Sequence, residues 1–297
     1  MVRLTRALGA VATAGAACVA YGTLIERRWY RRHRIVLPKS LPDAGRLSVL
    51  HVSDVHLVPG QQHRIDFLAS LGDLDHDLVI ATGDLVGAPG AEVLAADALA
   101  PLTSGGRPGV VVLGSNDLFG PVPKSPFAYF TRPERRVHGV PLATSLLLER
   151  LSEHGYTTLR NEATVVETAA GPIGVGGIDD PHLDETVIPP ASAVTPPSDG
   201  DTVANLGLVH APYTAALDVL IDAGHDVLFA GHTHGGQVRF PPIGALVGNC
   251  DLPLDQIRGP SRYRDHWLHV SPGLGHSRYA PFRFACRPEA TLLHLIG

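Results

Sequence analysis

Cysteine is scarce in this chain. Only three cysteines occur among its 297 residues, Cys18, Cys250 and Cys286, and no two of them form a CxxC pair. A disulfide framework or a zinc ribbon needs paired cysteines, so both are excluded. Charged residues are also few, at 18%, whereas hydrophobic residues make up 44%. This composition is typical of a globular core and not of a disordered chain.

Positive charge is scarce outside the N-terminal region. Residues 1–34 hold seven arginines and one glutamate, a net charge of +6, whereas the whole chain carries −5, so the remainder carries −11. An acidic body lacks the basic face that nucleic-acid binding requires, and we expect no nucleic-acid partner. The chain does hold sixteen histidines. Histidine is a common ligand of transition metals.

One long uncharged run lies near the N-terminus, at residues 7–25. A membrane-spanning helix needs about 20 mostly apolar residues. Because this run consists mainly of Ala and Gly, three interpretations stay open: an uncleaved membrane anchor, a signal peptide cleaved near Ala20, and an amphipathic or disordered extension. We favour the anchor. Residues 1–45 are then an anchor and linker, and residues 46–297 form one domain.

The arginines that flank this run predict its orientation. Five follow it, within residues 26–34, and two precede it. Cytoplasmic flanks carry an excess of Lys and Arg, so the catalytic body is expected on the cytoplasmic side. The N-terminal segment therefore predicts a membrane-associated protein with a single anchor and a cytoplasmic domain.

Five short apolar runs predict buried strands. Runs of four to eight residues rich in Val, Ile and Leu, bounded by Gly or Asp, are typical of such strands. The runs are residues 47–52, 78–82, 109–113, 204–209 and 226–230. Residues 91–102 and 213–224 predict helices between them. Alternation of strands and helices indicates an α/β fold.

A polar side chain with metal-binding capacity follows each of these runs. The set is Asp54, His56, Asp84, Asn116, His210, His232 and His234. Ligands of open α/β sheets bind beyond the carboxyl ends of the strands, so we expect these residues to converge. Two carboxylates, one amide and four imidazoles suit Mn, Fe, Zn or Co, whereas calcium prefers oxygen alone. Seven ligands favour two divalent ions about 3.5–4 Å apart that share a carboxylate.

Five motifs carry a family resemblance. They are DVH (54–56), GD (83–84), GSND (114–117), VH (209–210) and GHTH (231–234). In this order, over residues 46–297, the chain resembles the calcineurin-like metallophosphoesterase superfamily. The N-terminal run followed by GHTHGGQV most resembles its membrane-associated bacterial branch. The resemblance implies a four-layer fold, with two mixed sheets packed face to face between helices, and an apolar helix at the N-terminus.

The resemblance also implies roles for the site residues. Asp54, His56 and His234 would hold the first metal ion and Asp84 would bridge. His210, His232 and an amide of the third motif would hold the second. A metal-bound hydroxide would attack phosphorus. We therefore expect a phosphoric-ester hydrolase, more specifically a phosphodiesterase. Asp84, Asn116 and His210 would be catalytic, and the substrates include lipid-linked phosphate esters.

The third motif departs from the family pattern. The family reads Gly-Asn-His followed by Asp or Glu, and this chain reads Gly114, Ser115, Asn116 and Asp117. A gapless alignment places Ser115 on the metal-binding Asn and Asn116 on the catalytic His. A one-residue adjustment would let Asn116 bind the metal, which we favour. The family's general-acid histidine is missing in either case. A second interpretation therefore stays open, a non-catalytic metal-binding membrane protein.

Two loops are candidates for substrate selection. Residues 118–142 are basic and aromatic and directly follow the third motif. Residues 179–200 are acidic at first and then rich in Pro and Ser, and Asp179, Asp180 and His182 are placed to approach the site. Long loops beside a catalytic centre are often functional.

Overall fold

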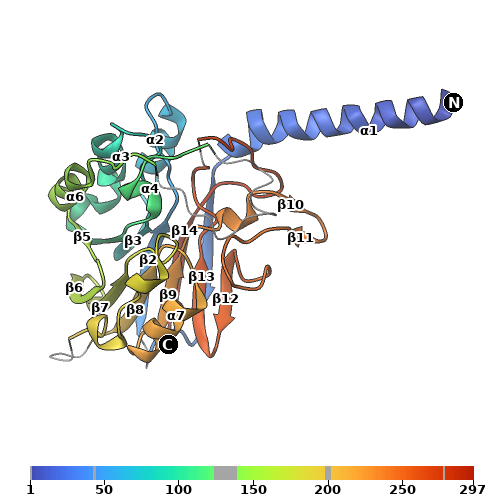
Figure 1. Cartoon of the computed structure of the whole chain (residues 1–297). Coiled ribbons are helices and arrows are strands. Elements are labelled where there is room, and N and C mark those ends of the chain that lie inside the picture. The colour runs from blue at the N-terminus through green and yellow to red at the C-terminus, as the bar shows by residue number, and fades with distance from the viewer. Residues whose placement is uncertain (1, 43–44, 124–138, 198–201, 277) are drawn as a thin grey trace.

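Two six-stranded sheets form the centre of the protein. The computed structural model describes residues 2–42, 45–123, 139–197, 202–276 and 278–297. The strand order is β1-β14-β2-β3-β4-β5 in the first sheet and β12-β13-β9-β8-β7-β6 in the second. The two sheets pack face to face, with helices outside them (Figure 1). The predicted α/β fold, with two mixed sheets flanked by helices, is confirmed.

The strands of the first sheet are β1 (Arg31–Leu37), β14 (Glu289–Ile296), β2 (Arg46–Val52), β3 (Leu78–Thr82), β4 (Gly109–Val112) and β5 (Tyr156–Thr158). Those of the second are β12 (Gly259–Tyr263), β13 (His266–Val270), β9 (Val227–Ala230), β8 (Ala204–Val209), β7 (Gly171–Ile178) and β6 (Glu162–Thr168). Strands β10 (Arg239–Phe240) and β11 (Gly244–Ala245) form a separate pair. All five predicted strands are present, with bounds that differ by one residue at most.

Parallel pairing brings the ends of the central strands together. Strands β2, β3, β4 and β5 pair in parallel, and so do β7, β8, β9 and β13. Antiparallel pairs occur at β14–β2, β6–β7 and β12–β13. Central strands that run the same way release their following loops at one edge of the sheet, which is where an α/β fold places its site.

The helices are α1 (Val2–Ala20), α2 (Gln62–Ala69), α3 (Glu92–Leu99), α4 (Ser115–Leu118), α6 (Thr144–Glu153) and α7 (Thr214–Asp222). Short π or 3-10 turns lie at Tyr21–Ile25, Glu26–Arg28, Ala100–Gly106, Glu185–Val187, Ala191–Ala193 and His234–Gly236. The helices predicted at 91–102 and 213–224 correspond to α3 and α7. The first is shorter than predicted because residues 100–106 continue as a 3-10 turn interrupted by Gly105 at φ +78°.

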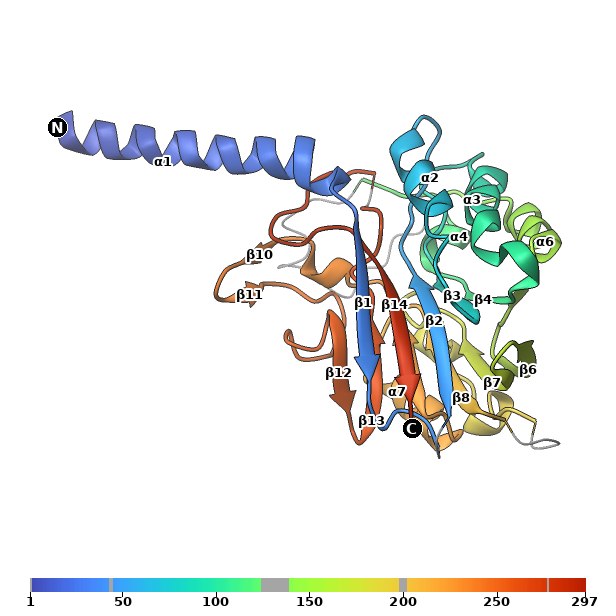
Figure 2. The ribbon, with the colours of Figure 1, turned by 180° about the vertical axis from the view of Figure 1, so that it is seen from behind.

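Three hydrophobic clusters hold four layers together. The central cluster lies between the sheets and contains Val49, Ile80, Leu206 and Phe229. A second joins the first sheet to α2, α3 and α6, and a third joins the second sheet to α7. Every residue of β3 and β9 is buried, which explains their continuous apolar sequences. Strands β1, β14 and β2 of the first sheet lie side by side (Figure 2).

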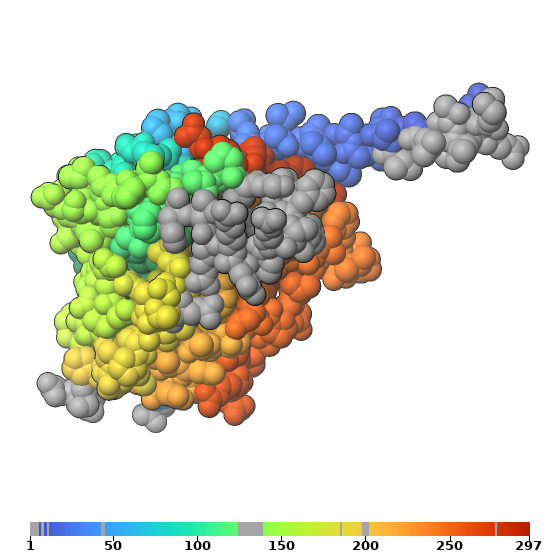
Figure 3. Space-filling view, viewed as in Figure 1, coloured from blue at the N-terminus to red at the C-terminus, as the bar shows by residue number. Residues whose placement is uncertain are grey.

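The N-terminal segment differs from its prediction. Helix α1 projects from the body (Figures 1 and 3). Within the described residues, none of the helices combines the length and the apolar character needed to cross a bilayer. Helix α1 includes Arg3 and Arg6, and Ala and Gly supply much of the rest. The predicted membrane anchor and membrane-associated localisation are therefore wrong.

Residues directly after this helix belong to the body of the protein. Strand β1 pairs in parallel with β14 over seven residues and forms one edge of the first sheet. Glu26 is buried, and its carboxylate accepts hydrogen bonds from the backbone N–H groups of Ala285 and Cys286 at 2.9 and 2.6 Å. The chain is thus tied to the sheet well before residue 46.

Candidate metal centre

The predicted ligands lie in the loops that follow the central strands of both sheets. Asp54 and His56 follow β2, Asp84 follows β3 and Asn116 follows β4. From the second sheet, His210 follows β8, while His232 and His234 follow β9. The two sheets thus contribute to one region.

Five of these residues have a backbone that L-amino acids rarely adopt. The φ angles of Asp54, His56, Asp84, His232 and His234 lie between +43° and +67°. Such conformations are uncommon outside glycine and collect at functional sites, because the surrounding structure must hold them in place. Each of them turns the chain sharply just beyond a strand.

Glycine makes the close approach of these loops possible. A Cβ at Gly231 would collide with Ser53 Oγ and lie 2.6 Å from Asp54 Oδ2. A Cβ at Gly114 would likewise collide with Asp84 Oδ1. The glycines of the GHTH and GSND motifs therefore let the loops of different strands touch.

A first group of donors consists of Asp54, His56 and His234. The Nε2 atoms of the two histidines are 3.3 Å apart. Asp54 Oδ1 lies 3.6 Å from Nε2 of His234 and 4.0 Å from Nε2 of His56. Asp54 Oδ2 accepts hydrogen bonds from Ser53 Oγ and the His232 N–H, but Oδ1 is buried and has no hydrogen-bond partner among the described residues.

A second group consists of Asp54, Asp84 and His210. Nε2 of His210 is buried and lies 3.4 Å from Asp84 Oδ2, and the described part of the chain offers it no hydrogen-bond partner. The same Oδ2 atom lies 3.5 Å from Nε2 of His56, which is in the first group. Nδ1 of His210 lies 2.6 Å from the Thr82 carbonyl and donates its hydrogen to it, which leaves Nε2 as the atom that can bind a metal ion after losing its proton.

The donor set fits divalent metal ions. Two ligands on one ion with bonds of about 2.1 Å lie roughly 3.0–3.4 Å apart, close to the separations in both groups. Buried polar atoms are normally satisfied, so the unpartnered Asp54 Oδ1 and His210 Nε2 require a missing partner. A cation held by carboxylates and imidazoles supplies that partner.

The pKa values of the donor side chains are shifted because these titratable groups lie buried and close together. Burial raises the pKa of Asp54 to about 6 and lowers the pKa of His56 to about 4. Burial also opposes charge on Asp84 and His210, but their mutual attraction prevails, so the pKa of Asp84 is well below and that of His210 well above its ordinary value. Carboxylates and imidazoles so close together favour a bound cation.

The third motif, residues 114–117, lies against the carboxylate of Asp84, which faces histidines of both donor groups. Nδ2 of Asn116 is 2.7 Å from Asp84 Oδ2, and the Asn116 backbone N–H donates to Asp84 Oδ1 at 2.8 Å. Rotation of the amide by half a turn would present its oxygen at the same place. Asp117 is buried and accepts hydrogen bonds from the N–H groups of Gly114, Leu85 and Val86. It thereby fixes the turn that presents Asn116.

His232 lies apart from both donor groups. Its Nε2 is 3.1 Å from the Asn249 carbonyl and 3.0 Å from the Asn249 amide nitrogen. Its ring centroid lies 5.2 Å from that of His210 and 4.3 Å from that of His182. Of the seven predicted ligands, the structure brings five into the two donor groups, places Asn116 on the shared Asp84 and turns His232 towards Asn249.

Part of the acidic loop, residues 179–200, lies beside the metal centre. His182 packs on His232, and its Nδ1 lies 3.1 Å from the Tyr213 hydroxyl. Asp180 is buried, and burial raises its pKa to about 6. Asp179 instead forms an ion pair with Arg160 at 3.1 Å. Most of the other loop, residues 124–138, lies outside the described residues, so its predicted role stays a prediction.

Sequence reasoning missed two neighbours of the site. Arg283 is fully buried and donates to backbone carbonyls of the adjoining loops, including those of Pro272 and Gly275. One of its nitrogens lies 3.3 Å from Nδ1 of His234. Asn249 is the partner of His232. Neither residue belongs to a motif, and no local pattern in the sequence marks them.

Comparison with known proteins identifies the family. Residues 47–236 match the family model described as calcineurin-like phosphoesterase. The chain is 33% identical over 165 residues to "Phosphodiesterase YaeI" of Escherichia coli (strain K12), covering 54% of this chain and 56% of YaeI. It is 34% identical over 142 residues to "Uncharacterized metallophosphoesterase YkoQ" of Bacillus subtilis (strain 168), covering 48% and 50%. These two matches span about half the length of each relative.

A longer match is weaker in identity. "Uncharacterized protein YpbG" of Bacillus subtilis (strain 168) is 27% identical over 253 residues, which cover 84% of this chain and 82% of YpbG. The family predicted from the five motifs is confirmed, and so, at the level of the family, is a metal-dependent phosphoesterase. The membrane-associated branch is not supported. The chain belongs to the calcineurin-like phosphoesterase family.

Proposed function

We propose that this protein is a phosphodiesterase that depends on two divalent metal ions. The observation that carries the proposal is the position of Asp84 Oδ2, 3.5 Å from His56 Nε2 in the first donor group and 3.4 Å from His210 Nε2 in the second. One carboxylate oxygen that serves two adjacent donor groups is the arrangement a two-metal site requires. The similarity to a relative named as a phosphodiesterase supports the choice of substrate class.

Each donor group would hold one ion. Asp54, His56 and His234 would hold the first, Asp84 would bridge, and His210 with Asn116 would hold the second. His232 would join the second position after its ring turns away from Asn249. Mn, Fe, Zn and Co all accept this mixture of imidazole and carboxylate ligands.

When bound, the two ions would neutralise charge on the phosphoryl oxygens and lower the pKa of the attacking water. The residues of the chain would orient the reaction. His56 and His210 face the shared carboxylate from opposite sheets, and Asn116 holds that carboxylate through its backbone and side chain. The buried cluster excludes water around the reacting phosphate, which strengthens each electrostatic contact.

Leaving-group chemistry should reflect the altered third motif. General-acid help is worth roughly 10²–10⁴-fold in rate, and Asn116 cannot donate a titrating proton as histidine does. The enzyme should therefore favour phosphodiesters with good leaving groups, such as aryl esters. Rates across a series of diesters, plotted against the pKa of the leaving group, should fall steeply. A flat plot would show that another residue supplies the proton.

The direct test is hydrolysis of bis-(p-nitrophenyl) phosphate by the full chain. We expect turnover with added Mn²⁺, Fe²⁺, Zn²⁺ or Co²⁺ and none after chelation. The altered third motif also favours one rival, a protein that binds metal without catalysis. Stoichiometric metal binding without hydrolysis of mono- or diesters would establish that rival and reject the phosphodiesterase.

A further inference from the structure

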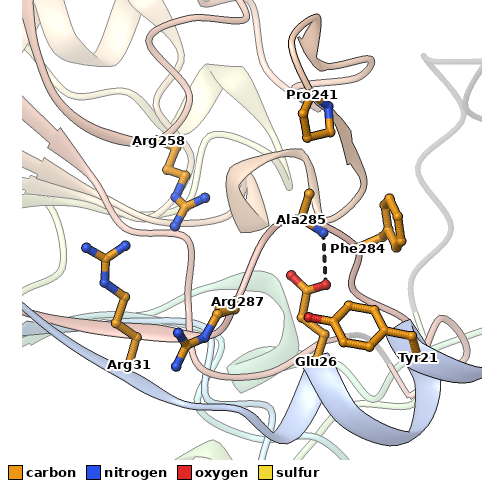
Figure 4. A pocket seen from close by; sticks show the side chains of 8 residues that line it. All are labelled: Tyr21, Glu26, Arg31, Pro241, Arg258, Phe284, Ala285 and Arg287. Carbon is orange, nitrogen blue, oxygen red and sulfur yellow. Dashed lines mark hydrogen bonds between the residues drawn. The ribbon is translucent and has the colours of Figure 1, made fainter. Parts of the chain in front are cut away.

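A cavity lies at the base of α1, near the turn that carries His234. It has a volume of about 430 Å³. It is lined by Tyr21, Glu26, Arg31, Pro241, Arg258, Phe284, Ala285 and Arg287. We call it the arginine pocket. In Figure 4 its three arginines lie on one side, and the rings of Tyr21 and Phe284 lie on the other. A cavity of this size suits a small organic molecule.

The charge of the arginine pocket is not balanced by the protein. Arg31 and Arg258 share one carboxylate oxygen of Glu289, at 3.7 and 3.3 Å. Glu26 is the one acid among the described residues that line the pocket, and both of its oxygens accept hydrogen bonds from backbone N–H groups. Three arginines therefore face two carboxylates, in a protein whose residues beyond 34 are strongly acidic.

Arg287 is held in place without an acidic partner. It donates hydrogen bonds to the carbonyls of Trp29 and Tyr30 at 2.9 and 3.2 Å, and its guanidinium stacks over the Trp29 ring at 4.0 Å. Across the part of the chain that the structure describes, no ion pair involves it. A guanidinium oriented in advance by carbonyls and a ring loses little entropy when it binds an anion.

The opposite wall is aromatic. The rings of Tyr21 and Phe284 meet edge to face, with centroids 6.3 Å apart. Aromatic walls bind flat apolar groups, while guanidinium groups bind phosphate through paired hydrogen bonds. The arginine wall is suited to the phosphate of a ligand, and the aromatic wall is suited to a flat apolar group of the same ligand.

We infer that the arginine pocket binds a small organic phosphate, with the phosphate on the arginines and a flat apolar group against Tyr21 and Phe284. The inference does not rest on the proposed phosphodiesterase activity, because none of the pocket residues belongs to the donor groups. The pocket nevertheless adjoins them. Arg258 packs on Gly235, and the Cys286 thiol lies 3.2 Å from the His234 carbonyl.

Titration calorimetry on the full chain, stripped of metal by a chelator, tests this inference. Phenyl phosphate is the probe. Without metal ions, the buried carboxylates of the metal centre repel anions, so binding there is suppressed. We expect saturable binding of one phenyl phosphate per chain with a Kd below about 1 mM, and no binding of phenol. Absence of saturable binding, or equal binding of phenol, would overturn the inference.

Matched variants locate the site. Arg287→Gln should weaken binding at least about tenfold, since hydrogen bonds to charged groups contribute strongly. Arg262→Gln is the control, because Arg262 also stacks on a tryptophan, Trp267, at 3.9 Å but lies outside the pocket. Arg31→Gln provides a second pocket variant on an exposed side chain, should Arg287→Gln fail to fold. Equal affinity in the wild type and a folded pocket variant, or equal loss in the control, would refute the assignment.

Discussion

The two donor groups of the metal centre differ in how complete they are. In the first, Asp54, His56 and His234 already face one another, with nitrogen and oxygen atoms 3.3 to 4.0 Å apart. In the second, Asp84 and His210 face each other, but His232 is engaged with Asn249. A preorganised site binds its ion without first breaking other contacts. The difference suggests that the first position is built by the fold and the second is completed on binding.

Asp84→Asn should have the largest effect, because it removes the charge that faces His56 of the first group and His210 of the second. We expect hydrolysis of bis-(p-nitrophenyl) phosphate to fall by at least about a hundredfold, on the scale seen when charge-stabilising groups are lost. Metal content measured on the same sample should fall as well. Asp97→Asn, which changes an exposed carboxylate paired with Arg150, is the matched control and should retain full activity. Near-normal rates with two tightly bound ions in Asp84→Asn would remove the bridge from the mechanism.

Asn116→Ala should separate the two positions. Loss of the amide beside Asp84 should lower occupancy of the second position by about ten- to a hundredfold and leave the first unchanged. Metal analysis at limiting metal, together with turnover, measures both. Ser115→Ala should change little. If Ser115→Ala were inactive and Asn116→Ala active, the gapless alignment of the third motif would be correct.

Metal titration of the unmodified protein should show that the two metal positions differ in affinity. Added Mn²⁺ should bind the stripped protein in two steps, with affinities at least about tenfold apart and the tighter step first. Binding stabilises the folded state by about 2.7 kcal/mol when free metal is a hundred times the Kd. For a chain of this size that raises Tm by roughly 4–5 °C. One indistinguishable step in calorimetry and in thermal unfolding would contradict unequal positions.

Asn249→Ala should have the smallest effect. The substitution removes the amide that contacts His232, but the backbone carbonyl at residue 249 remains in contact with the ring. We expect a change of about tenfold or less in the affinity of the second step and none in the first. A change confined to the first step would show that His232 serves the other ion.

The sequence predicted the strands and the meeting of their ends because both depend on local signals. Continuous runs such as residues 78–82 and 227–230 are buried on both sides, and turn residues follow them directly. The orientation of His232 could not be predicted, because it depends on Asn249, seventeen residues further along the chain. The arginine pocket could not be predicted either. It joins Tyr21, Arg258 and Arg287, which no motif or period connects.

The N-terminal prediction failed for a different reason. The uncharged run at residues 7–25 favours a membrane helix by its length, but its Ala and Gly residues contribute too little hydrophobicity for a span. The same prediction placed residues 31–37 outside the domain. Their alternation of exposed and half-buried residues is weak, and only pairing with β14 reveals their place in the sheet.

That pairing determines how the protein can safely be shortened. A chain that starts at residue 46 would lack β1 and leave the backbone of β14 as an open strand edge. Strand β1 is itself an edge, but its three arginines make that edge charged, whereas β14 is mainly apolar and would recruit strands from other molecules. Such a fragment should therefore aggregate even if its metal centre were intact. A chain that starts before Tyr21 retains β1, the Glu26 contacts and the arginine pocket. Strand β1 therefore reduces the tendency of the protein to self-associate, in addition to completing the first sheet.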